Sequence, residues 1–368
     1  MKVKLGDIFE IGSGGTPSKS HPEYYGGDIP WVKTGDLKSE YLYEVEDFIT
    51  EEGLKNSSAK LYEPDTVLIA MYGATIGATS ILKMDACTNQ ACAAFKKNDK
   101  VIPEYLYYFL KSQKVKFVKD GVGGAQPNIS AGYLKKVEME LPSLDEQRAI
   151  VEVLDKTTNI MVMRNQEIAS LDNLIKARFV EMFGDMYLNS KGWPEAKLES
   201  MADVVSGITK GRKTKAEDLT EVPYMAVSNV KDGYIDWTTV KTIEATQQEI
   251  EQYRLLADDV LMTEGGDPDK VGRGAIIKEP LENCIHQNHI FRVRLDESMI
   301  LPEFFAEYLQ HQRSKRYFLG CAKQTTGIAS INMTQLRALP VLMPPLSKQE
   351  EFVLFKAQVN KSKLKKLR

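Results

Sequence analysis

The stretch Leu141-Pro-Ser-Leu-Asp-Glu-Gln-Arg-Ala-Ile-Val151 recurs, altered in part, as Met343-Pro-Pro-Leu-Ser-Lys-Gln-Glu-Glu-Phe-Val353. In both places proline punctuates the chain, and a helical pattern of apolar residues begins just after it. The sequence therefore predicts two domains of one plan, each ending at such a stretch and each followed by a helix.

The helix after the first stretch is the most legible element. No Pro or Gly occurs from Leu144 to Phe183, Ser143 and Glu146 have the spacing of a capping box, and Gly184 suits a helix end. About 40 residues is far more than the usual dozen, which favours a coiled-coil arm over an ordinary core helix. Its expected seam repeats every seven residues, at Leu154, Met161, Ile168, Ile175 and Met182. The second helix begins at Leu346 and has only about twenty residues.

An internal repeat extends outward from these stretches. KLGDIFEIGSGGT from Lys4 matches KLESMADVVSGIT from Lys197, and Asp65-Thr-Val-Leu-Ile matches Asp258-Asp-Val-Leu-Met at the same offset. Each copy has short β-branched and aromatic runs broken by turn residues, which predicts strands. Short helices are expected after Pro103 and Pro302, because proline suits a first helical turn.

Composition sets broad limits. A chain of 368 residues with 43% hydrophobic residues has room for about two domains, and a net charge of −3 argues against a uniformly basic nucleic-acid binder. The four cysteines lack paired Cys-x-x-Cys spacing, and no basic-then-apolar leader opens the chain, so a cytoplasmic protein is expected. The uncharged run from Thr66 to Leu82 is expected to form strands and not a membrane span, because its counterpart in the second copy is full of charge.

A search for catalytic motifs fails. The glycine-rich stretch from Gly12 lacks the phosphate-loop spacing, since Pro17 and Ser18 stand where Gly and Lys are needed. His286 and His289 could form half a metal site, but nothing nearby completes it at a known spacing. We therefore expect no catalytic residue, no metal site and no cofactor bound by this chain itself.

Candidate DNA contacts lie in loops. The segment Gly207 to Lys215 carries four cations and no acid, so it could lie on a phosphate backbone or be an ordinary solvated loop. The small polar segments 123–130 and 325–332 align between the copies and could present amides to base edges. The candidate DNA-binding residues are Lys19, Lys33, Gln126, Asn128, Lys210, Arg212, Lys213, Lys215, Arg273 and Asn332.

Taken together, these features resemble the specificity (HsdS) subunit of type I restriction–modification systems. The resemblance rests on two variable halves of one plan, on the helix-opening motifs that end at Gln147 and Gln349, and on Phe183-Gly-Asp185 followed by Gly192-Trp193-Pro. It implies an α+β fold with two duplicated strand-rich target recognition domains separated by long, coiled-coil-forming helices. The expected divisions are 1–142 for the first recognition domain, 143–184 for the central helix, 185–345 for the second domain and 346–368 for the short C-terminal helix.

The resemblance also implies partners and a function. Each recognition domain would read one half of a split site in double-stranded DNA, and the two helices would pack antiparallel as a spacer. They would also dock two methyltransferase (HsdM) subunits that use S-adenosylmethionine, while motor-nuclease (HsdR) subunits would use ATP and Mg. The departure from the family pattern is the short second helix, which makes such a pair unequal.

Two other classes of protein remain open from the sequence. One is the DNA-reading module of another type of modification enzyme, which would need different partner genes. The other is a structural interaction scaffold without a DNA role. Neighbouring genes and a gel shift on random duplexes would discriminate between these classes.

Overall fold

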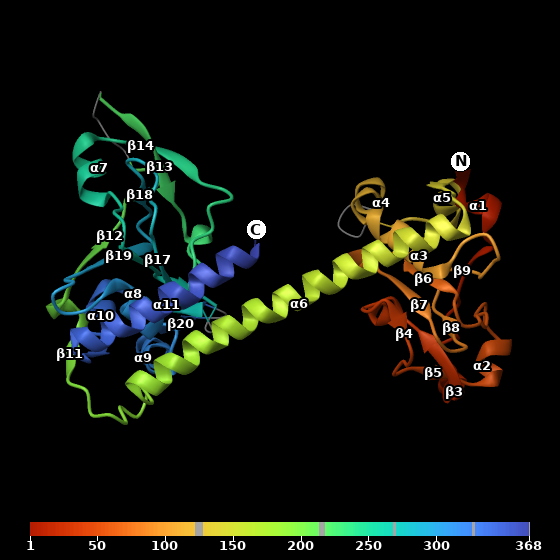
Figure 1. Ribbon diagram of the computed structural model, residues 1–368, viewed down its shortest axis with the longest axis horizontal. Coiled ribbons are helices and arrows are strands. Elements are labelled where there is room, and N and C mark those ends of the chain that lie inside the picture. The colour runs from red at the N-terminus through yellow and green to blue at the C-terminus, as the bar shows by residue number, and fades with distance from the viewer. Residues whose placement is uncertain (122–127, 213–217, 268–269, 326–327, 368) are drawn as a thin grey trace. The chain divides into compact units, whose positions relative to one another are not determined.

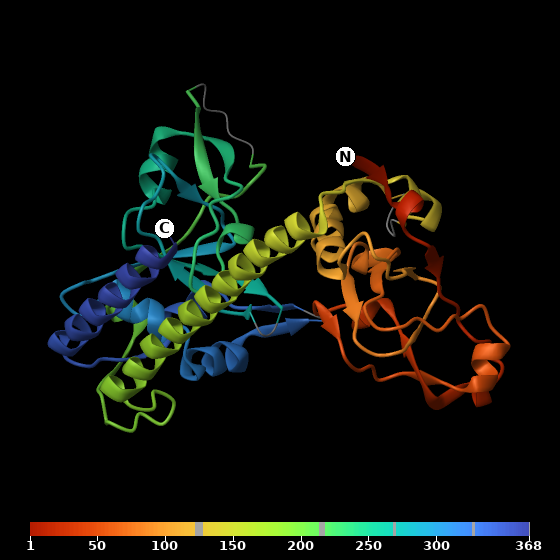
Figure 2. The same ribbon diagram turned by 45° about the vertical axis from the view of Figure 1, so that its right-hand side comes forward.

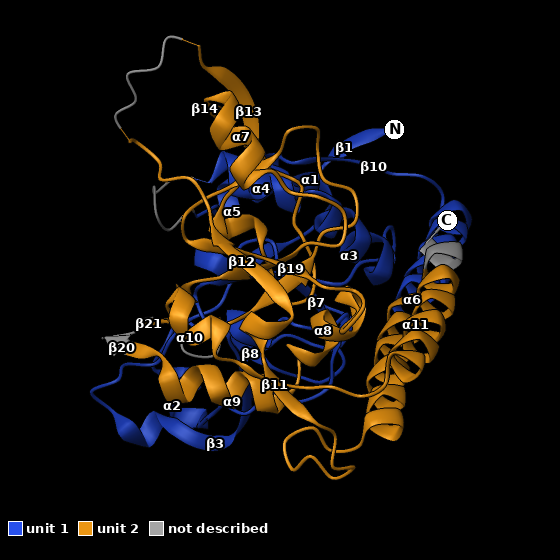
Figure 3. Ribbon diagram, turned by 90° about the vertical axis from the view of Figure 1, so that its left-hand side faces the viewer, with its two compact units in different colours: residues 1–163 blue, residues 164–368 orange. Residues whose placement is uncertain are grey.

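The computed structural model describes residues 1–121, 128–212, 218–267, 270–325 and 328–367 (Figure 1). The chain divides into two compact units, residues 1–163 and residues 164–368, and the division falls inside the long helix α6, Leu144–Phe183 (Figure 3). The expected helix is confirmed at both ends. The four-part division of the sequence into domains and helices stays a prediction.

The first unit is built on a five-stranded sheet in the order β2-β9-β6-β7-β4, beside a three-stranded sheet in the order β5-β3-β8. A separate antiparallel pair joins β1, Lys2–Lys4, to β10, Glu138–Glu140. The other strands are β2 (Ile11–Ser13), β3 (Tyr25–Val32), β4 (Tyr41–Leu42), β5 (Phe48–Ile49), β6 (Val67–Ala70), β7 (Thr79–Leu82), β8 (Cys87–Thr88) and β9 (Cys92–Phe95). The α-helices before α6 are α1 (Leu5–Ile8), α2 (Glu51–Lys55), α3 (Pro103–Ser112), α4 (Lys114–Asp120) and α5 (Ala131–Lys136), and the 3₁₀ helices are η1 (Pro22–Tyr24), η2 (Thr34–Asp36) and η3 (Gly73–Thr75).

The second unit repeats this plan. Its main sheet has the order β12-β19-β15-β17, and two three-stranded sheets have the orders β14-β13-β18 and β16-β21-β20. Its strands are β11 (Glu195–Lys197), β12 (Ala202–Ser206), β13 (Thr220–Met225), β14 (Lys241–Ala245), β15 (Val260–Thr263), β16 (Gly265–Gly266), β17 (Gly274–Ile276), β18 (Ile285–His286), β19 (Ile290–Leu295), β20 (Lys323–Thr325), β21 (Ile328–Ser330) and β22 (Pro340–Leu342). Its helices are η4 (Leu198–Ser200), η5 (Val227–Asn229), α7 (Gln247–Tyr253), α8 (Pro302–Tyr308), α9 (Gln312–Cys321), α10 (Met333–Arg337) and α11 (Leu346–Leu367).

Strand pairing confirms the internal repeat. β6 lies between β9 and β7, as β15 lies between β19 and β17, and all four of these pairs are antiparallel. The central strand of the smaller sheet has a parallel partner in each copy, with Trp31 opposite Cys87 and Tyr224 opposite Ile285. The short helices expected after Pro103 and Pro302 are α3 and α8.

The turn before each central strand is also repeated. Asp65 and Asp258 have φ values of 68° and 70°, a left-handed conformation that few residues other than glycine and Asp or Asn adopt readily. Each aspartate carboxylate then pairs with a lysine, Lys83 in the first copy and Lys278 in the second. All residues of the following strands β6 and β15 are buried, which explains the long uncharged run as core. In the described part of the chain, no helix is both long enough and apolar enough to cross a membrane.

Candidate DNA interface and helix junction

The start of α6 is fixed by its capping box. The Ser143 backbone N–H and hydroxyl both donate to the Glu146 carboxylate at 2.8 Å, while the Glu146 N–H donates to Ser143 Oγ at 3.3 Å. These bonds lower the pKa of the Glu146 carboxyl below its ordinary value. Gly184, with φ of 77°, ends the helix in the left-handed conformation expected of a C-terminal cap.

A buried glutamine holds α6 to the first copy. The Gln147 side chain is fully buried, and its Oε1 accepts from the Ile102 N–H at 3.0 Å. Its Nε2 donates to the Lys100 and Pro142 carbonyls at 2.9 and 3.0 Å. Three bonds to backbone groups satisfy the amide and tie the helix to the segment that opens α3.

The same clasp recurs in the second copy. Gln349 is fully buried, its Oε1 accepts from the Leu301 N–H at 2.8 Å, and its Nε2 donates to the Pro344 and Met299 carbonyls at 2.8 and 3.4 Å. The sequence marked these glutamines as signs of a helix start and missed their role. The available signal was that the charges around them differ between the copies, whereas the glutamine itself does not.

The C-terminal part of α6 packs against α11 around stacked rings (Figure 2). The Phe179 ring centroid lies 4.3 Å from that of His311, 5.1 Å from that of Phe352 and 5.5 Å from that of Phe304. Burial lowers the pKa of His311, so this imidazole is neutral near pH 7. The aromatic cluster joins the two helices to α8 in one core.

Ion pairs set the direction of the two helices. Arg178 pairs with Glu351 at 2.7 Å, and Asp172 pairs with Lys363 further along α11. Because the partner number on α6 falls as the number on α11 rises, the helices are antiparallel. A third contact, between Lys356 and Glu307 at 2.7 Å, fixes α11 to α8.

The expected seam is covered over only part of its length. Ile175 and Met182 are buried within the second unit, whereas Leu154 and Ile168 are partly exposed and Met161 is 61% exposed. A continuous intramolecular seam is therefore not formed, because α11 has 22 residues and lies against the C-terminal part of α6. The exposed apolar residues of the N-terminal part are Ile150, Val153, Ile160, Met161, Val162 and Met163.

In the first unit, the candidate DNA-contacting residues that the structure describes lie at the surface. Lys19 is exposed in a turn, and Asn128 is exposed where it bridges to Tyr72. The Lys33 ammonium pairs with Asp47 and lies 5.5 Å from the centroid of Trp31. Gln126 lies outside the described residues.

In the second unit, the cationic segment divides into two roles. Lys210 is exposed, but the Arg212 guanidinium donates two bonds to the Glu249 carboxylate, at 2.6 and 2.5 Å. The bond to Arg212 lowers the pKa of Glu249 to about 2. The prediction of Arg212 as a free phosphate-binding cation is therefore wrong for this structure, because the acid that pairs with it comes from α7. Lys213 and Lys215 lie outside the described residues.

Two further candidates have structural contacts. The Asn332 side chain caps α10 by accepting from the Gln335 N–H at 2.9 Å, so its oxygen is already used. Arg273 is half-buried beside β17, and its backbone carbonyl accepts from the Thr263 N–H. These contacts place both residues next to the β16-β21-β20 sheet without testing a DNA contact.

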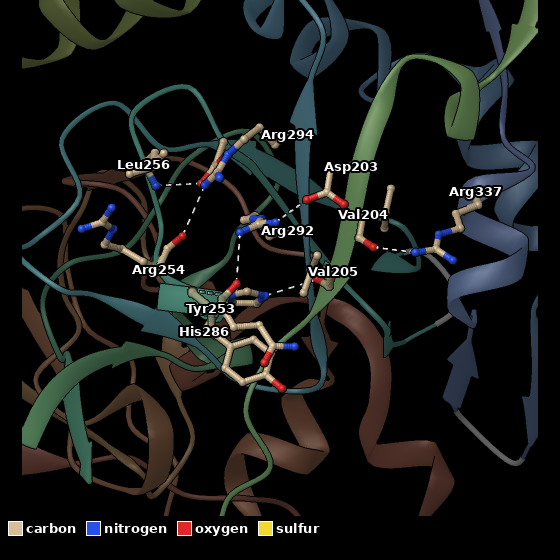
Figure 4. Close-up of polar contacts among 12 residues, drawn as sticks. Asp203, Val204, Val205, Tyr253, Arg254, Leu256, His286, Arg292, Arg294 and Arg337 are labelled. Atoms are coloured by element: carbon tan, nitrogen blue, oxygen red, sulfur yellow. Dashed lines mark hydrogen bonds and ion pairs between the residues drawn. The ribbon is translucent and has the colours of Figure 1, made fainter. Parts of the chain in front are cut away.

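Figure 4 shows why His286 is a core residue. It is fully buried, with its Nδ1 3.0 Å from the Tyr253 carbonyl and its Nε2 3.3 Å from the Val205 carbonyl. Burial lowers its pKa to about 4, so the neutral ring can donate to only one of these oxygens. Among the described residues no cluster of three His, Cys, Asp or Glu side chains could hold a metal ion.

A buried charge pair beside His286 was not foreseen. The Arg292 side chain is buried and bonds to Asp203 at 2.5 Å, while Arg294 pairs with the buried Asp259 at 2.8 Å (Figure 4). Both arginines come from β19, a strand whose alternation of apolar and charged residues would suggest that one face meets solvent. Tertiary pairing with distant acids, invisible in the local pattern, satisfies these charges instead.

The fold defines a class: a duplicated pair of strand-rich domains, each clasped to a helix and without a recognisable catalytic set among the described residues. The profile of the type I restriction modification DNA specificity domain matches residues 1–173 and 190–366, and the chain belongs to this family. Each matched region contains one copy of the repeat and most of the helix that follows it.

Individual relatives agree with this assignment. The chain is 30% identical over 250 residues to the type I restriction enzyme MjaIX specificity subunit of Methanocaldococcus jannaschii, covering 62% of this chain and 58% of that subunit. It is 20% identical over 350 residues to the EcoKI specificity subunit of Escherichia coli K12, covering 88% and 74%. A solved chain, from a study of assembly and conformational transition in a type I R-M system, covers 99% of this chain and 90% of its own length, with a TM-score of 0.60 and 16% identity. That last likeness concerns the fold.

Proposed function

We propose that this chain is the sequence-specific DNA-recognition subunit of a type I restriction–modification complex. Each copy of the repeat reads one half of a bipartite site, and α6 with α11 sets the unread spacing and docks methyltransferase subunits. The observation that supports this best is the family match to both copies, each clasped to its helix by an equivalent buried glutamine.

The chemistry is then divided among subunits. This chain contributes recognition and no catalytic group, while the methyltransferase subunits use S-adenosylmethionine and the motor-nuclease subunits use ATP and Mg. The exposed apolar side chains of α6 from Ile150 to Met163 are the surface proposed for partner docking. Such a contiguous apolar surface is unusual on an isolated soluble chain.

The test is to express this chain with its neighbouring methyltransferase gene in a host without other adenine methylation and to sequence the methylome. We expect one bipartite motif with a fixed gap. The methyltransferase expressed alone is the control and should give no such motif. Methylation without sequence preference, or a single continuous motif, would contradict the proposal.

A further inference from the structure

The second copy contains an open cavity that the catalytic search and the helix junction do not use. Its volume is about 600 Å³, within the usual range for ligand sites. It lies where β15 ends and β16 meets β21. The lining residues are Val227, Glu264, Gly265, Gly266, Asp267, His289 and Ser330.

The first copy has the same backbone frame at the equivalent place. The Ile129 N–H donates to the Met71 carbonyl at 3.0 Å, as the Ile331 N–H donates to the Glu264 carbonyl at 2.8 Å. Tyr72 is bridged to Asn128, as Gly265 is paired with Ser330.

The side chains on this shared frame differ completely. The offset of the repeat places the buried Met71 opposite Glu264, and the 44% exposed Tyr72 opposite Gly265. A scaffold that stays the same while its surface chemistry changes is what two readers of different sequences require.

The two glycines have different reasons to be there. A Cβ on Gly265 would lie 3.0 Å from the Ala329 carbonyl oxygen, so close pairing with β21 favours glycine. A Cβ on Gly266 would meet only the Lys270 Cβ, at 3.6 Å, which is ordinary contact. Packing therefore does not demand glycine at 266, and its effect is to keep the cavity open.

The charges in the cavity are arranged by depth. The Glu264 carboxylate accepts from His289 Nδ1 at 2.5 Å and is 35% exposed, whereas His289 is 55% exposed. Asp267 pairs with Lys270, and the pKa of its carboxyl is lowered first by that lysine and then by Arg273. Acceptors inside and cations at the edge suit the edge of a base that is flanked by phosphates.

We propose that Glu264, positioned by His289, reads the exocyclic amino group of a cytosine in the half-site of the second copy. An ionised carboxylate only accepts hydrogen bonds, and the N4 amino group is the donor that cytosine presents in the major groove. An unpaired acid next to DNA would repel phosphates, and the His289 contact reduces that cost. The inference rests on the proposed function and adds a residue and a base to it.

The experiment compares methylomes for the wild-type chain and for Glu264→Gln, each expressed with the methyltransferase. Glutamine keeps the size of the side chain but adds two donors, which suits adenine better than cytosine. We expect the preference for cytosine at one position of one half-site to fall by roughly 10- to 100-fold. The other half-site and the gap should be unchanged. Glu297→Gln, which alters an exposed carboxylate of the same unit, is the matched control and should keep the wild-type motif.

A second variant covers the case in which Glu264→Gln is inactive. Gly266→Ala narrows the cavity without a clash and should lower methylation of sites that carry the same cytosine. If both variants methylate the wild-type motif at wild-type rates, this inference is wrong and the proposed function stands. If the wild-type chain yields no bipartite motif, the proposed function itself fails.

Discussion

Ile150 and Phe352 occupy equivalent positions, three residues after the clasping glutamine of each copy, yet Ile150 is 40% exposed and Phe352 is fully buried. The clasps before them are nearly identical in geometry. The difference arises because Phe352 packs on Phe179 and Phe183 of another helix, whereas Ile150 lies on a part of α6 with a large exposed apolar surface. The comparison teaches that a repeated motif fixes where a helix starts and how it is anchored, but not what covers it.

Truncating the two equivalent side chains should separate the copies most strongly. Phe352→Ala should lower the free energy of unfolding of the second unit by about 3–5 kcal/mol, because it empties a buried aromatic site. Ile150→Ala should cost less than about 1 kcal/mol in the isolated chain, since much of that side chain already meets water. Urea unfolding followed by peptide-resolved hydrogen exchange measures each unit separately, and equal costs would contradict the comparison.

Removing the clasps should instead affect both copies alike. Gln147→Leu and Gln349→Leu each leave a buried N–H and buried carbonyls without a partner, at a cost of about 1–3 kcal/mol per unsatisfied group. Each variant should lose hydrogen-exchange protection in its own unit, at residues 100–106 or 299–305. Loss confined to one of the two variants would show that the clasps are not equivalent. The exposed Gln166, changed to Leu, is the control.

Shortening α6 tests whether the copies read independently. At about 1.5 Å per residue, α6 is roughly 60 Å long, or about 17 base pairs at roughly 3.4 Å each. Deleting the heptad Asn165–Leu171 should shorten it by about 10 Å and reduce the unread gap by a few base pairs at most. Both half-sequences should persist in the methylome. An assembled deletion variant with the original gap would refute this role for the helix, and altered half-sequences would place specificity outside the two copies.

The Arg212–Glu249 pair predicts a local effect of acid. The folded-state pKa of Glu249 is about 2, below its ordinary value of 4.5, so the pair contributes stability above pH 4.5 and loses it as pH falls toward 2. Arg212→Ala should return the pKa of Glu249 toward its ordinary value. NMR titration of the Glu249 carboxyl measures this shift, and an unchanged value would show that the Thr246 cap alone maintains it. Arg316→Ala is the matched control.

The exposed lysine of the same segment should have the smallest effect. If Lys210 contacts a phosphate, Lys210→Ala should reduce the slope of log affinity against log salt by roughly 0.9, and Lys213 and Lys215 should act likewise. The half-sequences recognised should not change. A gel-shift series across salt concentrations measures the slope, and an unchanged slope in the triple variant would mark the segment as an ordinary solvated loop.

These pairs also show how far the sequence could be read. Ser143, Glu146 and Gly184 act within a few residues, so the ends of α6 followed from local chemistry alone. The repeat gave the plan of the second unit because its offset held from Asp65 to Asp258. The roles of Arg212 and Asn332 did not follow, since Glu249 is 37 residues from its arginine and a cap is decided by backbone direction. The cavity beside Glu264 appeared only once β16 was paired with β21.

The continuity of α6 has a consequence for rotation. Every residue added to an α-helix turns all that follows by about 100°, whereas a heptad returns to within about 20° of the starting phase. DNA has its own phase, one turn in about ten base pairs. A helix without a break couples translation to rotation like a screw, so most single insertions would turn one reading face away from the groove. New gaps should therefore arise in steps of whole heptads, with intermediate lengths disfavoured by geometry and not by loss of folding.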